Sequence, residues 1–140
     1  MSVTWDEAVE QLKSAVQDLL RGDGSAYQEL WSHRGDVTMM GAYGGLATGW
    51  EQVSPAVERA AGNYTRWDPD YQEELLAAEA IGEMGYVVLR ESVGNRAATD
   101  DQRRFRRVTV LFRREAEAWK VFHHHSDPLH DPVRAHGSND

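Results

Sequence analysis

Apolar residues recur at intervals of three and four near the start of the chain, at Trp5, Val9, Leu12, Val16 and Leu19. This spacing predicts an amphipathic helix that lays one apolar stripe on a core and ends at Gly22. The first residues, Thr4 to Glu7, have the form of a capping box, which supports a helix start there. A stripe of this kind can also bind a partner, but covering the core of its own domain explains it more simply.

The next part of the chain predicts short elements. Ser25 repeats the capping pattern and opens a brief helix through residue 31, and residues 36–40 have the pattern of a short strand. Glycines at 41, 44 and 45 indicate a turn around Tyr43. A third helix is expected from about Gly49, and Pro55 is expected to kink or restart it. Its apolar stripe consists of Trp50, Val53, Val57, Ala60 and Tyr64.

Three later segments, residues 86–93, 106–114 and 119–125, are rich in β-branched and aromatic residues and predict successive antiparallel strands. Residues 72–80, QEELLAAEA, consist of strong helix formers, so local propensity alone predicts a helix there. The strands at 86–93 and 106–114 are apolar at both parities, which means that both faces of the sheet need cover. Helices can cover one face, and a second sheet or a second subunit must cover the other. We therefore expect a homodimer.

Length and charge narrow the class of protein. The chain has 140 residues, of which 41% are hydrophobic, and this suits a single domain with one compact core. The net charge of -8 argues against a nucleic-acid partner, because binding to phosphates depends on clustered Lys and Arg. The basic cluster at residues 103–107 leads into a strand-like run, so we interpret it as the solvated end of that strand.

Cysteine usage and the two ends of the chain bear on its location. The sequence contains no cysteine, which excludes disulfides and thiolate chemistry and fits a reducing cytoplasm. The N-terminus lacks the basic and apolar regions of a secretory signal, and no apolar run reaches the ~18 residues that a membrane span needs. We expect a soluble, cytoplasmic protein without membrane contacts. Residues 129–140 have the composition of a loosely held C-terminal tail.

Three of the six histidines stand in a row at His123, His124 and His125, on the last predicted strand. Because side chains alternate along a strand, His123 and His125 should share one face and His124 should lie on the other. A neutral imidazole can take a proton from a carbon acid or from water near neutral pH, so the pair at 123 and 125 is a candidate catalytic site. Hydrogen-bonded structural residues of the sheet are the alternative interpretation.

Other candidate site residues surround this strand in the predicted fold. Glu91 could hold an imidazole tautomer and stabilise its charged form, but the neighbouring Arg90 has the opposite parity, so only one of the two can face inward. The aromatic residues Tyr43, Tyr64 and Trp67 could line a cavity for a flat, apolar ligand.

The histidines could instead bind a metal ion. The His-x-His spacing supplies two ligands, and Asp127 or Glu91 could supply a third. No third ligand has a compelling position, however, and any strand with histidines two residues apart shows this spacing. We therefore expect neither a metal nor a cofactor.

Two stretches carry a resemblance to a known family. TGWEQV opens a helix after a Gly-rich turn, and RVTVLFRREAEAWKVFHHHSD forms the last pair of strands. Together they resemble the SnoaL-like and ketosteroid-isomerase-like branch of the nuclear transport factor 2-like superfamily. The second stretch also looks like the association domain of calcium/calmodulin-dependent protein kinase. The resemblance spans roughly residues 5–128, so we take residues 1–128 as one domain and 129–140 as its tail.

The resemblance implies an α+β fold in which a strongly curved antiparallel or mixed sheet forms a cone around N-terminal helices. It also implies a pocket at the open end, a homodimer packed through the outer sheet face, and an extended conformation for residues 72–80. The catalytic base of ketosteroid isomerases corresponds to Gly41 here, and the tyrosine of their oxyanion hole falls near Ala15. Steroid isomerisation by the family mechanism is therefore not expected. The arginine and aspartates of limonene epoxide hydrolases have no matching set either.

Two functions from different classes stay open. The first is an enzyme, such as a cyclase, isomerase or dehydratase, that acts on a small, apolar molecule by histidine-based proton transfer. The second is a non-catalytic module for ligand binding or oligomerisation, like the kinase association domain. For the enzyme, the candidate catalytic residues are His123, His125 and Glu91. The candidate ligand-binding residues are Tyr43, Tyr64, Trp67 and Arg90.

Overall fold

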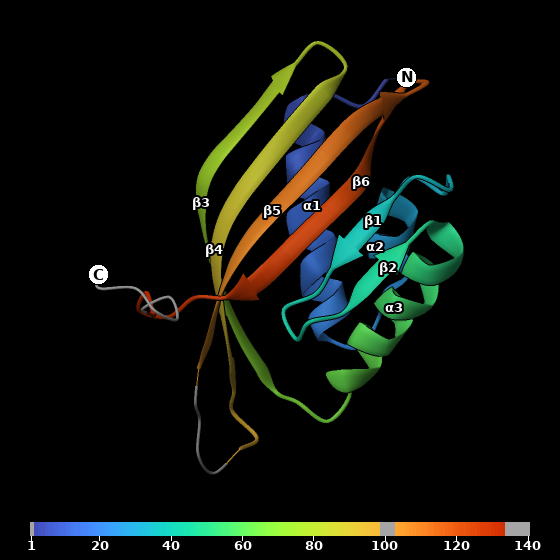
Figure 1. Ribbon diagram of the computed structural model, residues 1–140. Coiled ribbons are helices and arrows are strands. Elements are labelled where there is room, and N and C mark those ends of the chain that lie inside the picture. The colour runs from blue at the N-terminus through green and yellow to red at the C-terminus, as the bar shows by residue number, and fades with distance from the viewer. Residues whose placement is uncertain (1, 99–102, 134–140) are drawn as a thin grey trace.

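The computed structural model describes residues 2–98 and 103–133 of the chain. Within these residues, helices and a short hairpin come first and long strands follow (Figure 1). The helices are α1 (Trp5–Leu20), α2 (Ser25–Leu30) and α3 (Trp50–Asn63). The strands are β1 (Thr38–Met40), β2 (Leu46–Thr48), β3 (Pro69–Ile81), β4 (Met84–Asn95), β5 (Arg104–Glu115) and β6 (Ala118–Pro128).

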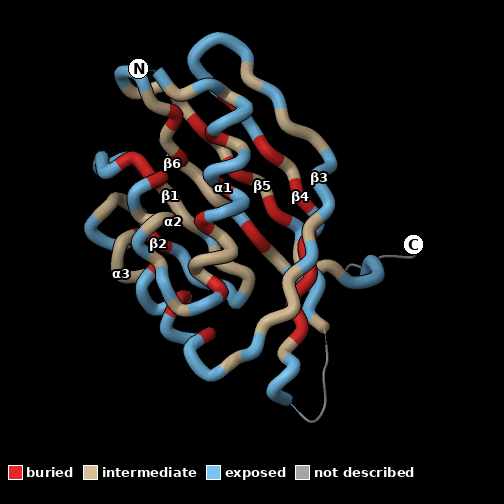
Figure 2. The backbone as a smooth tube through the Cα atoms, turned by 180° about the vertical axis from the view of Figure 1, so that it is seen from behind, coloured by how far each residue is buried: buried red, intermediate tan, exposed pale blue. Residues whose placement is uncertain are grey.

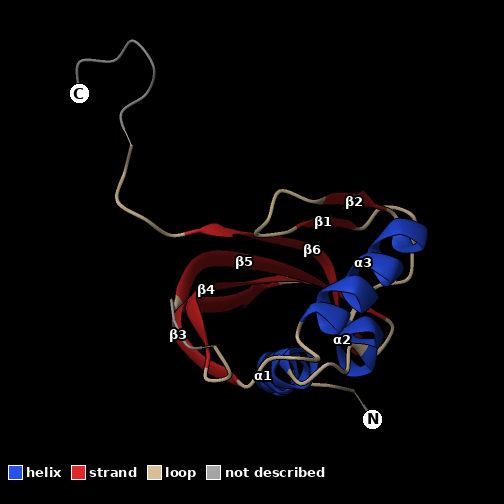
Figure 3. Ribbon diagram, turned by 90° about the horizontal axis from the view of Figure 1, so that it is seen from below, coloured by secondary structure: helices blue, strands red, loops and turns tan. Residues whose placement is uncertain are grey.

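These strands form one 6-stranded sheet in the order β2-β1-β6-β5-β4-β3. Neighbouring strands are antiparallel except β1 and β6, which are parallel. The sheet curves around the helices, and its edge strands β2 and β3 stay apart (Figure 3). The predicted α+β architecture, with a curved mixed sheet around N-terminal helices, is therefore confirmed, although the sheet does not close on itself.

Helix α1 begins where the capping pattern predicts. Thr4 Oγ1 accepts a hydrogen bond from the backbone nitrogen of Glu7 at 3.1 Å, which satisfies one of the unpaired N–H groups at the helix start. The helix ends at Leu20, and Gly22 follows with a φ of 96°, a conformation that costs glycine little. The apolar stripe of α1 packs against the concave face of the sheet, so the helix covers the core of its own domain.

Three local details differ from the sequence-based prediction. The N-cap residue of α2 is Gly24 rather than Ser25, and the preceding Asp23 accepts hydrogen bonds through Oδ1 from the backbone nitrogen and the hydroxyl of Ser25 at 3.0 and 2.6 Å. Helix α3 runs without interruption through Pro55, so the expected restart is wrong. The missing N–H of a proline removes one hydrogen bond, and the rest of the helix continues. Residues 46–48, where no strand was expected, pair with β1 as β2.

Residues 72–80 lie within β3 and are extended, which confirms the conformation that the family resemblance implied. Their helix propensity amounts to tenths of a kcal/mol per residue, whereas the strand pairs with β4 along its whole length and places Ala78 and Ala80 against the core. Tertiary pairing therefore outweighs the local preference. The register shifts by one residue between Leu75 and Ala77, as at a β-bulge.

The core fills the space between the helices and the concave face of the sheet (Figure 2). Tyr27 and Phe112 are among its largest fully buried side chains. The ring of Trp5 closes one end and meets Phe112 and Trp119 edge-on, at centroid distances of 5.3 and 5.1 Å. This ring also lies against Gly85, where an added Cβ would sit 2.4 Å from it. A glycine is therefore required at this point of β4 for steric reasons.

The convex face of the sheet carries no helix in the part of the chain that the structure describes (Figures 1 and 3). Several large hydrophobic side chains on this side are exposed: Met40, Leu46, Ile81, Met84 and Tyr86. Among the described residues, no helix combines the length and the apolar character that crossing a bilayer requires. Strand β6 ends at Pro128, and residues 134–140 of the expected tail lie outside the described part.

Candidate active site

A cavity of about 390 Å³ lies between α1, the Gly-rich turn that joins β1 and β2, the end of α3 and the concave side of β4, β5 and β6. Its apolar wall consists mainly of helix residues and aromatic rings, and its charged groups come from the sheet. It is lined by Val16, Leu19, Leu20, Tyr27, Met39, Gly41, Ala42, Tyr43, Ala60, Asn63, Tyr64, Trp67, Glu91, Arg104, Arg106, His124 and Ser126. Gly41, the position of the missing isomerase base, is therefore part of the cavity wall.

The alternation predicted for His123, His124 and His125 holds, but strand β6 has an irregularity just before them. Val121 pairs with Phe112 and His123 pairs with Leu111, so Phe122 is an extra residue in the ladder. This β-bulge reverses the alternation beyond it. As a result His124 lines the cavity, and His123 and His125 do not. The expectation that the outer two histidines face the cavity is corrected by the bulge.

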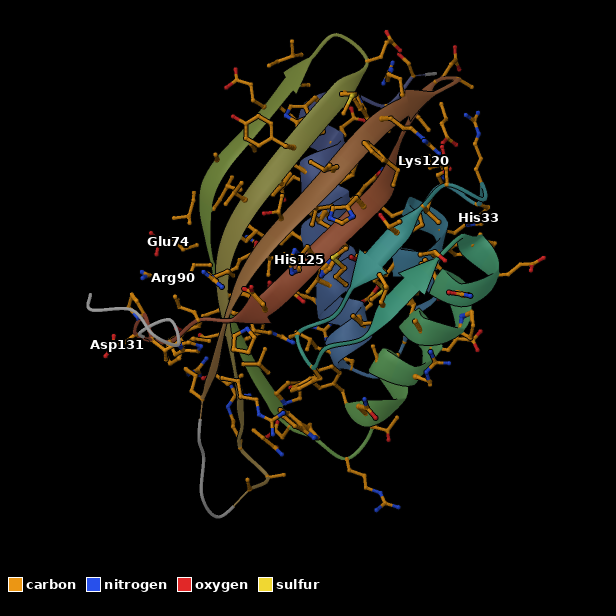
Figure 4. The ribbon with its side chains drawn as sticks, viewed as in Figure 1. His33, Glu74, Arg90, Lys120, His125 and Asp131 are labelled. Atoms are coloured by element: carbon orange, nitrogen blue, oxygen red, sulfur yellow. The ribbon has the colours of Figure 1, made fainter. Side chains whose placement is uncertain are left out.

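His123 and His125 lie together on the convex side of the sheet, with ring centroids 6.4 Å apart. His123 Nδ1 lies 2.7 Å from Thr38 Oγ1 on the adjacent β1. Burial, and then the neighbouring His125, lower the pKa of His123. His125 is exposed, and Figure 4 shows its position over β6. Both residues are placed to act at the outer surface of the sheet.

His124 forms a hydrogen bond with a buried tyrosine that the sequence analysis did not single out. Its Nδ1 lies 2.6 Å from the hydroxyl of Tyr27, which is only 1% exposed. Burial lowers the pKa of His124 to about 3, and the charge of Arg106 acts in the same direction. Burial also raises the pKa of Tyr27 above its ordinary value. Both side chains are therefore neutral at physiological pH.

Glu91 is the buried carboxylate of the cavity, at 7% exposure. Its Oε1 lies 2.9 Å from Arg106 Nε, and its Oε2 accepts a hydrogen bond from the Tyr71 hydroxyl at 2.8 Å. The Nε–H of Arg106 is not directed along the first contact, so that contact is an ion pair rather than a hydrogen bond. Arg106 also donates from Nη1 to the hydroxyl of Tyr64 at 3.3 Å. Burial opposes the charge of Arg106, but Glu91 and Tyr64 outweigh it and raise the pKa of the guanidinium.

Arg90 faces away from the cavity and Glu91 faces into it. The sequence had left open which of these two neighbours on β4 faces inward. Its Nη2 donates to Glu74 Oε2 on β3 at 2.6 Å, and both side chains are more than half exposed. Figure 4 shows the two residues beside one another at the outer side of the sheet. Arg90 is therefore not in the cavity wall that was expected to bind a ligand.

Three aromatic residues that were expected to bind a ligand do line the cavity. Tyr64 and Trp67 meet edge-on with ring centroids 5.1 Å apart. Tyr43 lies on the Gly-rich turn and is 68% exposed, and its hydroxyl accepts a hydrogen bond from Arg104 Nη1 at 2.5 Å. The Arg104 guanidinium lies 5.1 Å from the ring of Trp67 and 5.5 Å from that of Tyr43. These groups form the mouth of the cavity.

The described residues contain no group of three or more His, Asp or Glu side chains that could hold a metal ion. Asp127, the carboxylate nearest to the histidines in sequence, forms a two-point ion pair with Arg107, with both contacts at 2.8 Å. The hydrogen bond from Arg107 lowers the pKa of Asp127. The cavity lining carries one carboxylate, one neutral imidazole, two guanidinium groups and three phenols among apolar side chains, and groups of these kinds can carry out acid–base chemistry.

Residues 9–129 match the family model of the SnoaL-like domain. No curated protein matches the sequence at a significant level. Solved structures share the fold of this chain over most of its length, but their sequence identity to it is low. At these identities the similarity establishes the fold alone.

Three solved structures illustrate this similarity. A candidate calcium/calmodulin-dependent protein kinase type II association domain from Thiobacillus denitrificans has a TM-score of 0.75 at 18% identity, covering 93% of this chain and 98% of that one. A candidate dehydratase of the nuclear transport factor 2-like family from Streptomyces avermitilis has a TM-score of 0.68 at 20% identity, covering 90% and 99%. A ketosteroid isomerase-like protein from Erwinia carotovora atroseptica has a TM-score of 0.68 at 13% identity, covering 90% and 96%.

Proposed function

The chain belongs to the SnoaL-like domain family, and on that premise we propose that it is an enzyme that transfers a proton on a small, flat, largely apolar molecule bound in the cavity. The single observation that carries the proposal is Glu91: a carboxylate that is buried, lines an aromatic cavity and is held by two partners. A carboxylate in such surroundings can accept a proton from a carbon acid that the apolar walls bring to it.

In this proposal Glu91 is the proton acceptor. Arg106 and Tyr71 fix its two oxygens, and the guanidinium is its counter-charge. Such orientation matters because a misplaced base loses much of its catalytic effect. Gly41, to which the resemblance assigns the base of ketosteroid isomerases, has no side chain that could accept a proton, so we assign this role to Glu91 on β4 of the same cavity.

His124 and Tyr27 hold the polar end of the ligand. Because Tyr27 keeps its proton, the arrangement that we propose has its hydroxyl donating to His124 Nδ1, and Nε2 then carries the ring proton. A neutral imidazole N–H can donate to a ligand oxygen on which negative charge develops when Glu91 removes a proton. Tyr43, Tyr64 and Trp67 would enclose the apolar body of the ligand.

The test uses 2-tetralone, a flat aromatic ketone with acidic α-protons, in D2O. Loss of the α-proton signals in the ¹H NMR spectrum measures proton abstraction directly, whatever the natural substrate is. We expect the protein to accelerate this exchange and Glu91→Gln to slow it by ~10²-fold or more. Glu79→Gln, on the exposed side of β3, is the control and should exchange like the wild type. Exchange no faster than in buffer would contradict the proposal.

The catalytic roles expected for His123 and His125 stay predictions. Their place on the convex side separates them from Glu91, so we propose that any role they have is at that surface. His125→Ala should leave 2-tetralone exchange unchanged, whereas His124→Ala should slow it. The reverse result would restore the original assignment of His123 and His125.

A second candidate function is a non-catalytic assembly or ligand-binding module. It is supported by the likeness to the candidate kinase association domain and by the exposed apolar side chains on the convex face. In either case we propose a homodimer that buries this face. Sedimentation should show a species of twice the 15.8 kDa monomer, and Met84→Glu should shift it to the monomer. A wild-type species at monomer mass would contradict the dimer. The cytoplasmic location expected from the sequence also stays a prediction.

A further inference from the structure

We propose that Glu73, which lies outside the cavity, exchanges protons with Glu91 through the hydroxyl of Tyr71, so that the three side chains form a relay from the cavity to the surface. The direction of transfer rests on the proposed function, in which Glu91 takes a proton from the ligand. The coupling between the two carboxyl groups does not depend on it.

The geometry joins the three groups in a line. The Tyr71 hydroxyl lies 2.8 Å from Glu91 Oε2 and 2.9 Å from Glu73 Oε2. Glu73 and Glu91 are direct cross-strand partners on β3 and β4, on the same face of the sheet. Like charges placed directly opposite one another are unfavourable, and here a phenol stands between them.

The two carboxyl groups open onto different spaces. Glu91 lines the cavity between α1 and the sheet. Glu73 lines a separate hollow of about 190 Å³ between α1 and the β3–β4 pair, together with Glu10 and Lys13. The two spaces lie along different stretches of α1, at residues 16–20 and 9–13, and the Tyr71 hydroxyl links Glu91 in the first to Glu73 in the second. The relay therefore leads from a buried carboxyl group to a half-buried one.

The number of protons held by Glu91, Tyr71 and Glu73 determines which of the two contacts of the Tyr71 hydroxyl are full hydrogen bonds. A phenol has one proton and can donate to one carboxylate at a time. Its second contact of this length becomes a full hydrogen bond when the other carboxyl group carries a proton, whereas with two carboxylates the phenolic proton is shared between them. The geometry thus fits the state that holds one additional proton, which is the state reached when Glu91 has taken a proton from a ligand.

The transfer conserves protons and charge, and it does not pass through a tyrosinate. The proton on Glu91 Oε2 moves to the Tyr71 oxygen while the phenolic proton moves to Glu73 Oε2. Glu91 becomes a carboxylate again, Tyr71 is again a phenol, and Glu73 releases its proton to water. Burial, and then the charges of Glu91 and Glu73, raise the pKa of Tyr71 well above its ordinary value. A free phenolate is therefore avoided, and the two hops occur together.

The surrounding charges favour this direction. Arg106 on β5 contacts Glu91 and stabilises its carboxylate form, and Tyr64 at the end of α3 contacts the same guanidinium. His124 on β6 and Tyr27 on α2 are neutral and add no competing charge to the cavity. On the other side, Glu10 and Lys13 of α1 line the hollow beside Glu73. Arg106, at the cavity end, is in direct contact with a carboxyl group of the relay.

The decisive experiment follows the side-chain carboxyl ¹³C signals of Glu73 and Glu91 in the intact protein as pH is varied. Groups that share a proton titrate as a coupled pair. We expect Glu73→Gln to displace the titration curve of Glu91 by about one pH unit. We expect Tyr71→Phe to displace it as well, because the bridge is gone. Glu79→Gln, on the exposed side of β3, is the control and should leave the curve in place.

A Glu91 curve that is the same in Glu73→Gln as in the wild type would overturn the relay. If Tyr71→Phe does not fold, Glu73→Gln alone decides, because Glu73 is half-buried at the rim of the open hollow and its replacement by an amide keeps its shape. Proton exchange of 2-tetralone in D2O supplies the second readout. A blocked relay returns the proton to the ligand, so Glu73→Gln should slow the exchange, but by less than the ~10²-fold or greater loss in Glu91→Gln.

The two readouts separate the two proposals. Coupled titration without exchange of 2-tetralone would retain the relay and contradict the proposed function. Exchange without coupled titration would retain the proposed function and overturn the relay.

Discussion

The hydroxyl of Tyr27 and Nδ1 of His124 lie 2.6 Å apart, between a short helix and the last strand of the sheet. The pair joins two segments that are distant in sequence, and burial, followed by the charge of Arg106, lowers the pKa of His124 so that the imidazole is neutral. This arrangement makes the stability of the fold depend on pH.

We expect the free energy of unfolding to fall as pH decreases from about 6.5 towards about 3. The pKa of His124 is lowered to about 3 in the folded chain, chiefly by burial, whereas an unfolded histidine titrates near ~6.5. In this window the unfolded state binds a proton that the folded state does not, so acid favours unfolding. Urea titrations at pH 7 and pH 4 measure the difference.

The matched variants for this prediction are His124→Gln and His130→Gln. The first removes the titrating group and should make the pH dependence shallower. The second replaces an exposed histidine beyond β6 and should leave it as in the wild type. An equally steep loss of stability in His124→Gln would show that other groups cause it.

The ion pair between Arg106 and Glu91 should contribute strongly to stability. Replacing Arg106 with methionine leaves a buried carboxylate without its cation, which we expect to destabilise the fold by about 3 kcal/mol or more. The adjacent Arg107→Met breaks the exposed pair with Asp127 and should change little. Chemical denaturation of both variants checks this. Adding Glu91→Gln to Arg106→Met should recover part of the loss, and a double variant no more stable than the single one would contradict the explanation.

Aromatic stacking at the mouth should govern ligand affinity. We expect Trp67→Ala to weaken the binding of 2-naphthol, a flat fluorescent ligand, by roughly tenfold, since the cavity loses one wall and a partner for Tyr64. Phe105→Ala removes an aromatic side chain that alternates outward between Arg104 and Arg106 on β5 and should have no effect. Fluorescence titration measures both. Equal affinity in wild type and Trp67→Ala would place the ligand elsewhere.

The contact between Gly85 and Trp5 should make this glycine difficult to replace. Gly85→Ala would place a Cβ 2.4 Å from the Trp5 ring, which is fixed by Phe112 and Trp119, and overpacking of this kind costs about 1–3 kcal/mol. Gly45→Ala, with nothing near its Cβ, is the control. Thermal unfolding of the pair measures the cost. The cost should shrink when Gly85→Ala is combined with Trp5→Leu, and a cost that persists would point to the backbone instead.

Much of the scaffold could be predicted from the sequence because its signals are local or repeated. The stripe of α1 and its Thr4 cap lie within one helix, and the long strands are marked by β-branched and aromatic residues. Strand β3 could not be predicted from its own residues, since Glu, Leu and Ala favour helix. Its conformation depends on pairing with β4, which only the resemblance of the whole chain to a family revealed.

The candidate site was predicted in part. The aromatic residues at the mouth and Glu91 line the cavity, and His123 and His125 share one face as expected, but the bulge at Phe122 turns that face away from the cavity, which alternation within residues 123–125 could not reveal. The adjacent apolar residues Val121 and Phe122 were a local sign that the alternation breaks there. Tyr27 and Tyr71 gave no comparable sign, because their roles depend on partners 97 and 20 residues away.

The bulge at Phe122 also bears on how the strand tolerates insertions and deletions during evolution. A slip of one residue beyond Val121 would turn His124 outward and bring His123 and His125 inward, so an imidazole would face the cavity in either frame. Because three histidines stand in a row, the cavity keeps an imidazole in its wall when the hairpin gains or loses one residue. A single histidine at this position would have no such protection.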